Sequence, residues 1–108
     1  MKKILIDKVL APKVSPLDYT TQLLEDLKHP AEAAAYIEAA TLEGDRDGLL
    51  MAFRQVAAAN GGIASIAEQP GLSRVSLYRA FSRRGNPTVS TLNSVLAAMG
   101  LRLSVQPA

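Results

Sequence analysis

The stretch IASIAEQPGLSRVSLYRAF, residues 63–81, decides the fold because its residue types suit two short helices that meet at a sharp turn. The small Ala67 suits the point where the second helix crosses the first, and Gly71 can adopt the positive φ that the turn needs. Leu72 can anchor the turn. Ser73 can cap the free N–H groups of the following helix. Together these residues predict a helix-turn-helix.

The second of these helices has an apolar inner side and a polar outer side. Its inner residues are Leu77, Ala80 and Phe81, at the spacing of one helical face. A recognition helix places its N-terminal part in the major groove of DNA. The outward residues are Arg74, Val75, Ser76, Tyr78 and Arg79, and we predict base-edge contacts from Arg74, Val75, Ser76 and Arg79. Arg can bind guanine with two hydrogen bonds, and Val can contact a thymine methyl group.

The flanks of this helix and the loop behind it suit the DNA backbone. The loop contains two adjacent cations and a Gly85 that we interpret as flexible, and a further helix begins near Thr88 with free backbone N–H groups. Contacts to phosphate position a protein on the duplex and are predicted for Ser73, Tyr78, Arg83, Arg84, Asn86 and Thr88.

A plainer interpretation exists for each of these residues taken singly. Gly71 and Leu77 would look the same in any tight pair of helices. Arg74 and Arg79 could be solvated charges or partners of Glu68. The DNA-binding interpretation is favoured because the cations coincide with the one face and loop that this motif turns toward DNA.

The rest of the chain predicts a compact, all-α protein with short connections. Helices are expected over 17–27, 31–42, 47–59, 63–69, 73–81 and 89–99, with breaks at Pro30, Gly44 and Asn60-Gly61-Gly62. The period-two pattern of Leu101 to Val105 predicts a short C-terminal strand. Residues 4–6 are expected to be a short strand or part of an arm. We divide the chain into an N-terminal arm with two helices, residues 1–45, and a helix-turn-helix domain, residues 46–108.

Charge is distributed unevenly between these two parts. Residues 1–45 contain five Lys and eight acidic residues, a net charge of −3, whereas residues 46–108 contain seven Arg and two acidic residues, a net charge of +5. The planar guanidinium suits phosphates and guanine edges, so the second part is suited to a polyanion. The acidic first part suggests a second surface with a different partner.

Several other classes of protein are disfavoured. The chain has no Cys and a single His, His29 beside Pro30, so neither a metal site nor a catalytic set of side chains is visible. We therefore expect no cofactor and no enzymatic activity. The apolar run at residues 4–6 is too short for a signal peptide, and no stretch reaches the roughly 20 apolar residues of a membrane span. We expect a cytoplasmic protein that does not bind membranes.

Three pieces of the chain also resemble a known family. Residues 71–82, 85–88 and 92–101 are similar to the Cro/repressor-like antitoxins of bacterial toxin–antitoxin operons, and in particular to the HigA-like addiction module antidotes. Leu77-Tyr78-Arg79 and Gly85-Asn86-Pro87-Thr88 are the most specific pieces. Residues 18–19, 35–37 and 43–45 extend the resemblance over most of the chain. Pro70 departs from the pattern, where a polar residue is expected, and predicts that the preceding helix ends early.

The resemblance implies a repressor of its own operon that also neutralises a toxin. The implied partner is a small RelE/ParE-like toxin, commonly an mRNA nuclease that acts on the ribosome. The acidic N-terminal part would suit a basic toxin of this kind. As a repressor, the protein is expected to bind a palindromic operator as a homodimer, with recognition helices about 34 Å apart. Residues 101–105 and 89–99 are candidates for the dimer contact.

One alternative remains open at this point. The chain could be a stand-alone Cro-like transcriptional regulator without a toxin, in which residues 1–45 serve as a dimerisation or ligand module. Co-expression with the adjacent open reading frame distinguishes the two hypotheses, because only an antitoxin forms a stable complex with its product.

Overall fold

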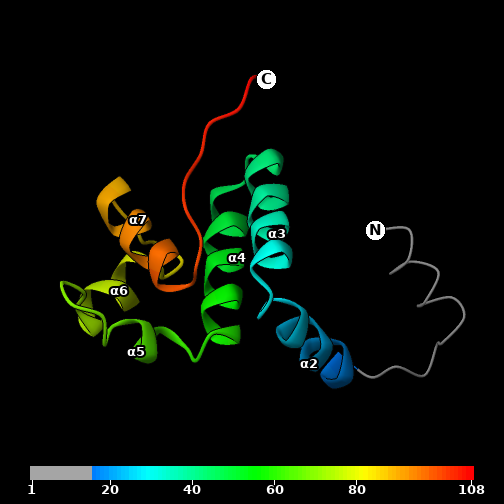
Figure 1. Ribbon diagram of the computed structural model, residues 1–108, viewed down its shortest axis with the longest axis horizontal. Helices are drawn as coiled ribbons and strands as arrows, with labels where there is room; N and C mark the ends of the chain where they lie inside the picture. The colour runs from blue at the N-terminus through cyan, green and yellow to red at the C-terminus, as the bar shows by residue number, and fades with distance from the viewer. Residues whose placement is uncertain (1–15) are drawn as a thin grey trace, which may run out of the picture.

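The computed structural model describes residues 16–108, and these residues form helices joined by short connections (Figure 1). The possible strand at residues 4–6 lies outside them. None of the described helices is long and apolar enough to cross a membrane. The elements are α2 (Pro16–Asp26), α3 (Pro30–Glu43), α4 (Arg46–Ala59), α5 (Ile63–Ile66), α6 (Arg74–Ala80) and α7 (Val89–Ala98).

Local sequence signals set the ends of the central hairpin, α3 and α4. Pro30 occupies the first turn of α3, where its missing N–H costs nothing. Gly44 ends α3 with a φ of 72°, a left-handed conformation that favours glycine. Asp45 then caps α4, because its carboxylate accepts the N–H groups of Asp47 and Gly48, both at 3.2 Å. The two helices therefore begin and end within one residue of the bounds that the sequence predicts.

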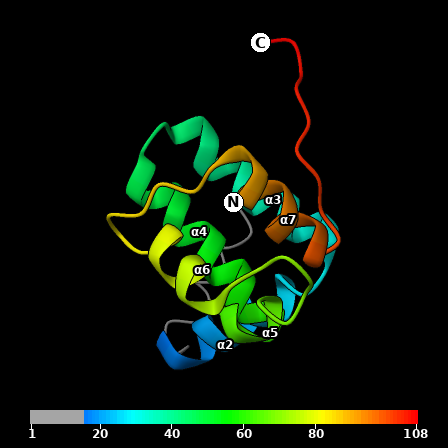
Figure 2. The same cartoon turned by 90° about the vertical axis from the view of Figure 1, so that its left-hand side faces the viewer.

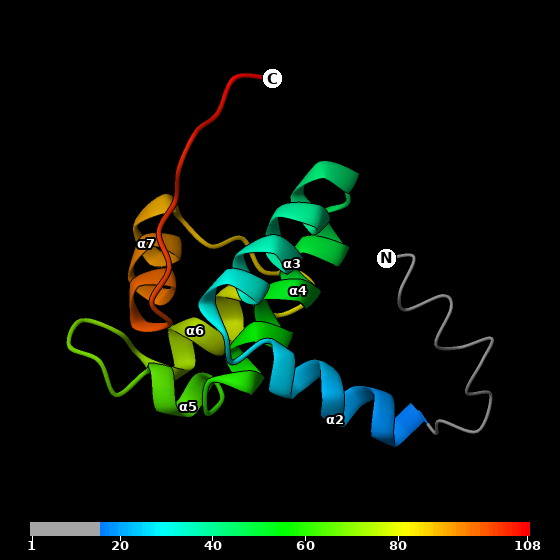
Figure 3. The same cartoon turned by 45° about the vertical axis from the view of Figure 1, so that its right-hand side comes forward.

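Helix α4 is the centre of the molecule. It contacts α2 and α3 on one side and α5 on the other, so that α2 and the group α5–α7 lie on opposite sides of it (Figures 1 and 3). On the α3 side, the Tyr36 hydroxyl donates to Gln55 Oε1 at 2.5 Å. Leu27, just after α2, and Ala33, in the first turn of α3, are each 2% exposed and belong to the same core as α4.

The other side of α4 forms the main core with α5, α6 and α7. The rings of Phe53 and Phe81 lie 5.5 Å apart at 48°, a tilted arrangement that aromatic pairs favour. Val56 and Leu77 are the largest fully buried side chains of the described residues. Burial of a side chain such as Leu77 stabilises the fold by about 1.5–3 kcal/mol. These contacts fix α6 against α4 through its inner face.

The C-terminal tail differs from the sequence prediction. Residues 101–108 form no strand, although Leu101, Leu103 and Val105 alternate with polar residues. A strand needs a neighbouring strand for its backbone hydrogen bonds, and residues 16–108 contain none. Leu101 packs partly against the core, but Leu103 and Val105 are 46% and 99% exposed, so no face of the tail is buried beyond Leu101. The predicted strand is therefore wrong for this part of the chain.

Two helix ends follow from their local chemistry. Helix α5 ends at Ile66, three residues before the predicted Gln69, and tighter i to i−3 hydrogen bonds follow it. This early end agrees with Pro70, which disfavours helical geometry in the residue before it. Helix α7 ends in a Schellman motif, because the Leu101 N–H donates to the Leu96 carbonyl at 2.7 Å around Gly100.

Candidate nucleic-acid interface

The connection between α5 and α6 has the features that the sequence predicts for a tight turn. Gly71 has a φ of 84°, and Leu72, half-buried, packs against the core. Ser73 has an extended backbone, and its Oγ accepts the Ser76 N–H at 3.3 Å. The hydroxyl thus caps α6. The turn and the cap together fix the direction in which α6 leaves α5.

Helix α6 separates its inner and outer residues as predicted. Leu77 and Phe81 are 2% and 3% exposed, and Ala80 is half-buried against the same core. The other side chains of α6 are exposed, and the helix lies on the side of the molecule that faces the viewer in Figure 2. All the residues predicted to reach base edges, and Tyr78 beside them, are exposed: Arg74, Val75, Ser76, Tyr78 and Arg79.

The cations of this face are mostly unpaired. Within the described residues, the ion pairs are Lys28–Glu25 and Arg83–Asp47. Neither Arg74 nor Arg79 pairs with Glu68, so the interpretation of these arginines as its partners is wrong for this structure. Their guanidinium groups are free to meet an anion.

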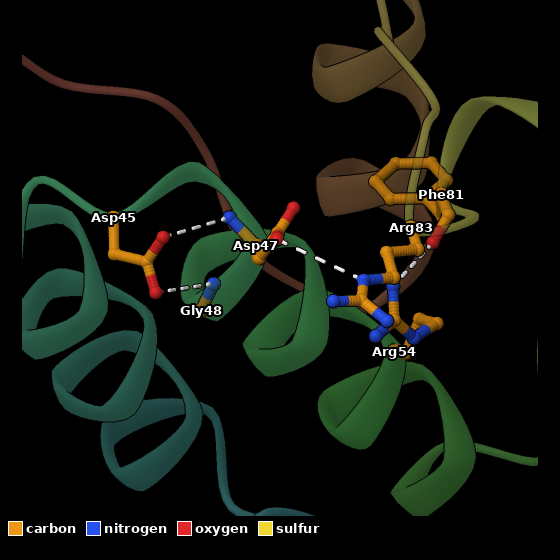
Figure 4. A network of polar contacts seen from close by, with 6 residues as sticks. All are labelled: Asp45, Asp47, Gly48, Arg54, Phe81 and Arg83. Atoms are coloured by element: carbon orange, nitrogen blue, oxygen red, sulfur yellow. Dashed lines mark hydrogen bonds and ion pairs between the residues drawn. The ribbon is translucent and has the colours of Figure 1, made fainter.

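The loop behind α6 carries the other predicted phosphate contacts. Arg83, Arg84 and Asn86 are all exposed. The Nε of Arg83 lies 3.9 Å from Asp47 Oδ2 at the start of α4 (Figure 4). Their side chains are 86% and 58% exposed, and such an ion pair contributes at most about 1 kcal/mol. A phosphate group could therefore replace Asp47 at little cost.

Thr88 is the N-cap residue of α7. Its Oγ1 accepts the Thr91 N–H at 3.1 Å and lies 3.0 Å from Thr91 Oγ1. The hydroxyl is thus engaged in capping. Any contact of this helix end with phosphate would then come from the first backbone N–H groups of α7. The predicted phosphate contact of Thr88 stays a prediction.

Two arginines of α4, which the sequence pattern does not single out, hold the loop. The Nη1 of Arg54 donates to the carbonyl of Phe81 at 2.7 Å (Figure 4), and the Nη2 of Arg46 donates to the carbonyl of Gly85. These pairs are 27 and 39 residues apart in the chain. No local motif signals such contacts, because they depend on how α4 passes the end of α6.

Gly85 is buried, which corrects its interpretation as a flexible residue. A Cβ at this position would lie 1.9 Å from the carbonyl oxygen of Ala80 and 2.5 Å from that of Arg79. Its N–H donates to the Ser82 carbonyl at 2.8 Å. Glycine is required here by lack of space, since its φ is not in the left-handed region. The loop is thus a packed turn against the end of α6.

The opposite side of the molecule is acidic. Between residues 18 and 45 the only Lys is Lys28, which pairs with Glu25 at 2.9 Å. The acidic side chains of α2 and α3 are all exposed: Asp18, Glu25, Asp26, Glu32, Glu38 and Glu43. Asp45 caps α4 beside Asp47, the partner of Arg83, and is not part of this acidic side. Helix α4 therefore separates an acidic side, on α2 and α3, from the arginine-rich side on α6 and its loop.

The fold and the distribution of charge together define a class of protein. It is a helical protein with acidic side chains on α2 and α3 and a separate basic helix, α6, with its loop. A family model described as "Probable addiction module antidote protein" matches residues 13–107, and the chain belongs to this family. An uncharacterized protein of Haemophilus influenzae is 34% identical over 82 residues, which cover 76% of this chain and 84% of the relative. No solved structure matches the chain significantly.

Proposed function

We propose that the chain is the antitoxin of a toxin–antitoxin module, and that it binds operator DNA through α5 and α6 to repress its own operon. The observation that carries the DNA-binding part is the arrangement of α6. Leu77 anchors this helix in the core, while Arg74 and Arg79 lie unpaired on its outer face. In this proposal α5 and α6 form a Cro/repressor-like helix-turn-helix of the HigA-like type.

The side chains of α6 and its loop divide into two kinds of contact. Arg74, Val75, Ser76 and Arg79 read base edges in the major groove. Ser73, Tyr78 and Asn86 contact the DNA backbone, with Arg83, Arg84 and the N-terminus of α7 near Thr88. The exposure of the α6 side chains supports this division. A second copy of the chain binds the other half of a palindromic operator, so the active species is a homodimer.

Membership in the antidote family supports the second role, the neutralisation of a toxin. We infer that the partner is a small RelE/ParE-like toxin. A basic toxin would be attracted by the exposed acidic side chains of α2 and α3, which lie away from the arginine-rich side. Both roles could then be served by one protomer at the same time.

The first experiment is fluorescence-anisotropy binding to the DNA upstream of the gene and to a scrambled duplex, at several salt concentrations. We expect tight binding that prefers the upstream DNA and weakens with salt. Arg79→Ala should cost about 1–3 kcal/mol on the upstream DNA and relax the preference at one base position. Equal loss on both duplexes would contradict base reading by Arg79.

Arg83→Ala is the matched variant for a phosphate contact. It should weaken binding to both duplexes similarly and reduce the salt slope by about one unit. The toxin role is tested separately, by co-expression with the adjacent open reading frame. A stable complex supports the antitoxin, whereas DNA binding without any complex would favour a stand-alone regulator.

A further inference from the structure

We propose that Arg46 and Arg54 are positioning residues for DNA binding: they do not contact DNA but hold the loop 81–85 so that Arg83 and Arg84 meet the phosphates. The proposal rests on the proposed DNA-binding function. It assigns a specific role to two cations of α4 that would otherwise be counted as part of a general basic surface.

The two arginines hold opposite ends of the same loop. Arg54 donates to the carbonyl of Phe81, the C-cap residue of α6, and Arg46 donates to the carbonyl of Gly85. Along α4 they are eight residues apart, which is about 12 Å. Two anchors at this separation fix both the position and the direction of the short loop between them.

The loop is also held together by hydrogen bonds of its own. The Gly85 N–H donates to the Ser82 carbonyl at 2.8 Å, and the Ser82 Oγ donates to the Arg79 carbonyl at 2.7 Å. Gly85 packs directly against the backbone of Ala80. A tight turn of this kind transmits the position of its ends to the residues at its tip, Arg83 and Arg84.

The partners of Arg46 and Arg54 explain why this is a positioning role. Both guanidinium groups donate to neutral carbonyls, and a hydrogen bond to a charged donor is stronger than one between neutral groups. Arg54 is half-buried, and its Nη1 is used in the hydrogen bond to the Phe81 carbonyl. Arg46 and Arg84 are both exposed, but Arg46 binds the Gly85 carbonyl whereas Arg84 has no partner among the described residues.

A double-mutant cycle tests the proposal on the full chain. Arg54→Met and Arg46→Met keep the apolar stem of each side chain and remove the donor. In the otherwise unchanged protein, we expect each to weaken binding to the upstream DNA about tenfold, the effect of one charged hydrogen bond. In a background that carries Arg83→Ala and Arg84→Ala, the same substitutions should change binding by less than about twofold. An equal loss in both backgrounds would overturn the proposal, because it would indicate a direct contact with DNA.

A second measurement needs no DNA and so separates this proposal from the proposed function. Amide hydrogen exchange of the free protein should show faster exchange at Gly85 in both Met variants, by about tenfold. The amide of Val56, in the buried part of α4, is the internal control. Unchanged exchange at Gly85, or equal acceleration at Gly85 and Val56, would overturn the proposal. Faster exchange at Gly85 in the variants, together with no DNA binding by the wild type, would show that Arg46 and Arg54 hold the loop and would contradict the proposed DNA-binding function.

Discussion

Replacement of Gly85 by Ala tests how closely the loop packs against α6. The added Cβ would lie 1.9 Å from the Ala80 carbonyl oxygen, far inside the 3.0 Å below which real Cβ contacts essentially never occur. The obstacle is backbone, so no side-chain rotation can relieve it. The loop must instead move away from α6 by about 1 Å, which strains or breaks the bond from Arg46.

The magnitude follows from these two effects. Forcing extra atoms into a packed site costs about 1–3 kcal/mol, and loss of a hydrogen bond to a charged donor costs about 1.5–3 kcal/mol. We therefore expect Gly85→Ala to lower the free energy of unfolding by about 3 kcal/mol. Urea denaturation followed by far-ultraviolet circular dichroism measures this value directly.

Gly48→Ala is the matched control, because Gly48 lies within α4 and its added Cβ meets only the end of the Asp45 side chain, at 3.1 Å. Ala is favoured over Gly in a helix by up to about 1 kcal/mol, but its Cβ also presses on the Asp45 oxygen that caps α4, so we expect this variant to stay within about 1 kcal/mol of the wild type. If Gly85→Ala stays within about 0.5 kcal/mol of the wild type, the packing of the loop against α6 does not exist in solution and this reasoning is refuted.

Two further predictions concern single polar contacts. Asp47→Asn removes the carboxylate beside Arg83 and should tighten binding to upstream and scrambled DNA alike, by up to about fivefold in anisotropy titrations; unchanged affinity would show that Asp47 does not compete with phosphate. Burial, with a smaller contribution from Tyr19, raises the pKa of Tyr36 above its ordinary value of 10.0, against the opposing hydrogen bond to Gln55. The folded chain thus holds this proton more tightly than the unfolded chain. The contribution of Tyr36 to the free energy of unfolding is therefore fully present below pH 10 and is lost as the pH rises through the raised pKa. Urea midpoints between about pH 9 and 11 should show this fall in the wild type and in the exposed-residue control Tyr78→Phe, and a smaller fall in Tyr36→Phe; equal falls in all three would contradict the assignment.

The helices could be predicted from the sequence because their signals are local. Pro30 and Gly44 mark the two ends of α3, and Ser73 marks the start of α6. Leu77 follows the cap by four residues, which places it on the inner face of α6 and leaves Arg74 and Arg79 outside. The candidate surface on α6 therefore follows from a cap and a helical period alone.

The tail and the loop could not be predicted because their structure depends on partners distant in the chain. Alternation from Leu101 to Val105 describes which residues could share a face, but it does not supply the second strand that a ladder requires. Gly85 was ambiguous for a similar reason. A glycine in a sequence can mark freedom of the backbone or lack of space beside it, and here only the position of Ala80 decides between them.

The same distinction applies to charge, because arginines of one segment occupy three different environments. Arg46 and Arg54 bind carbonyls of their own chain, Arg83 faces Asp47, and Arg74 and Arg79 have no partner among the described residues. Salt dependence of DNA binding counts phosphates neutralised, not arginines present. If the protein binds DNA as proposed, the net charge of residues 46–108 overstates the number of phosphate contacts, because Arg46 and Arg54 already bind carbonyls at the two ends of the loop that carries Arg83 and Arg84.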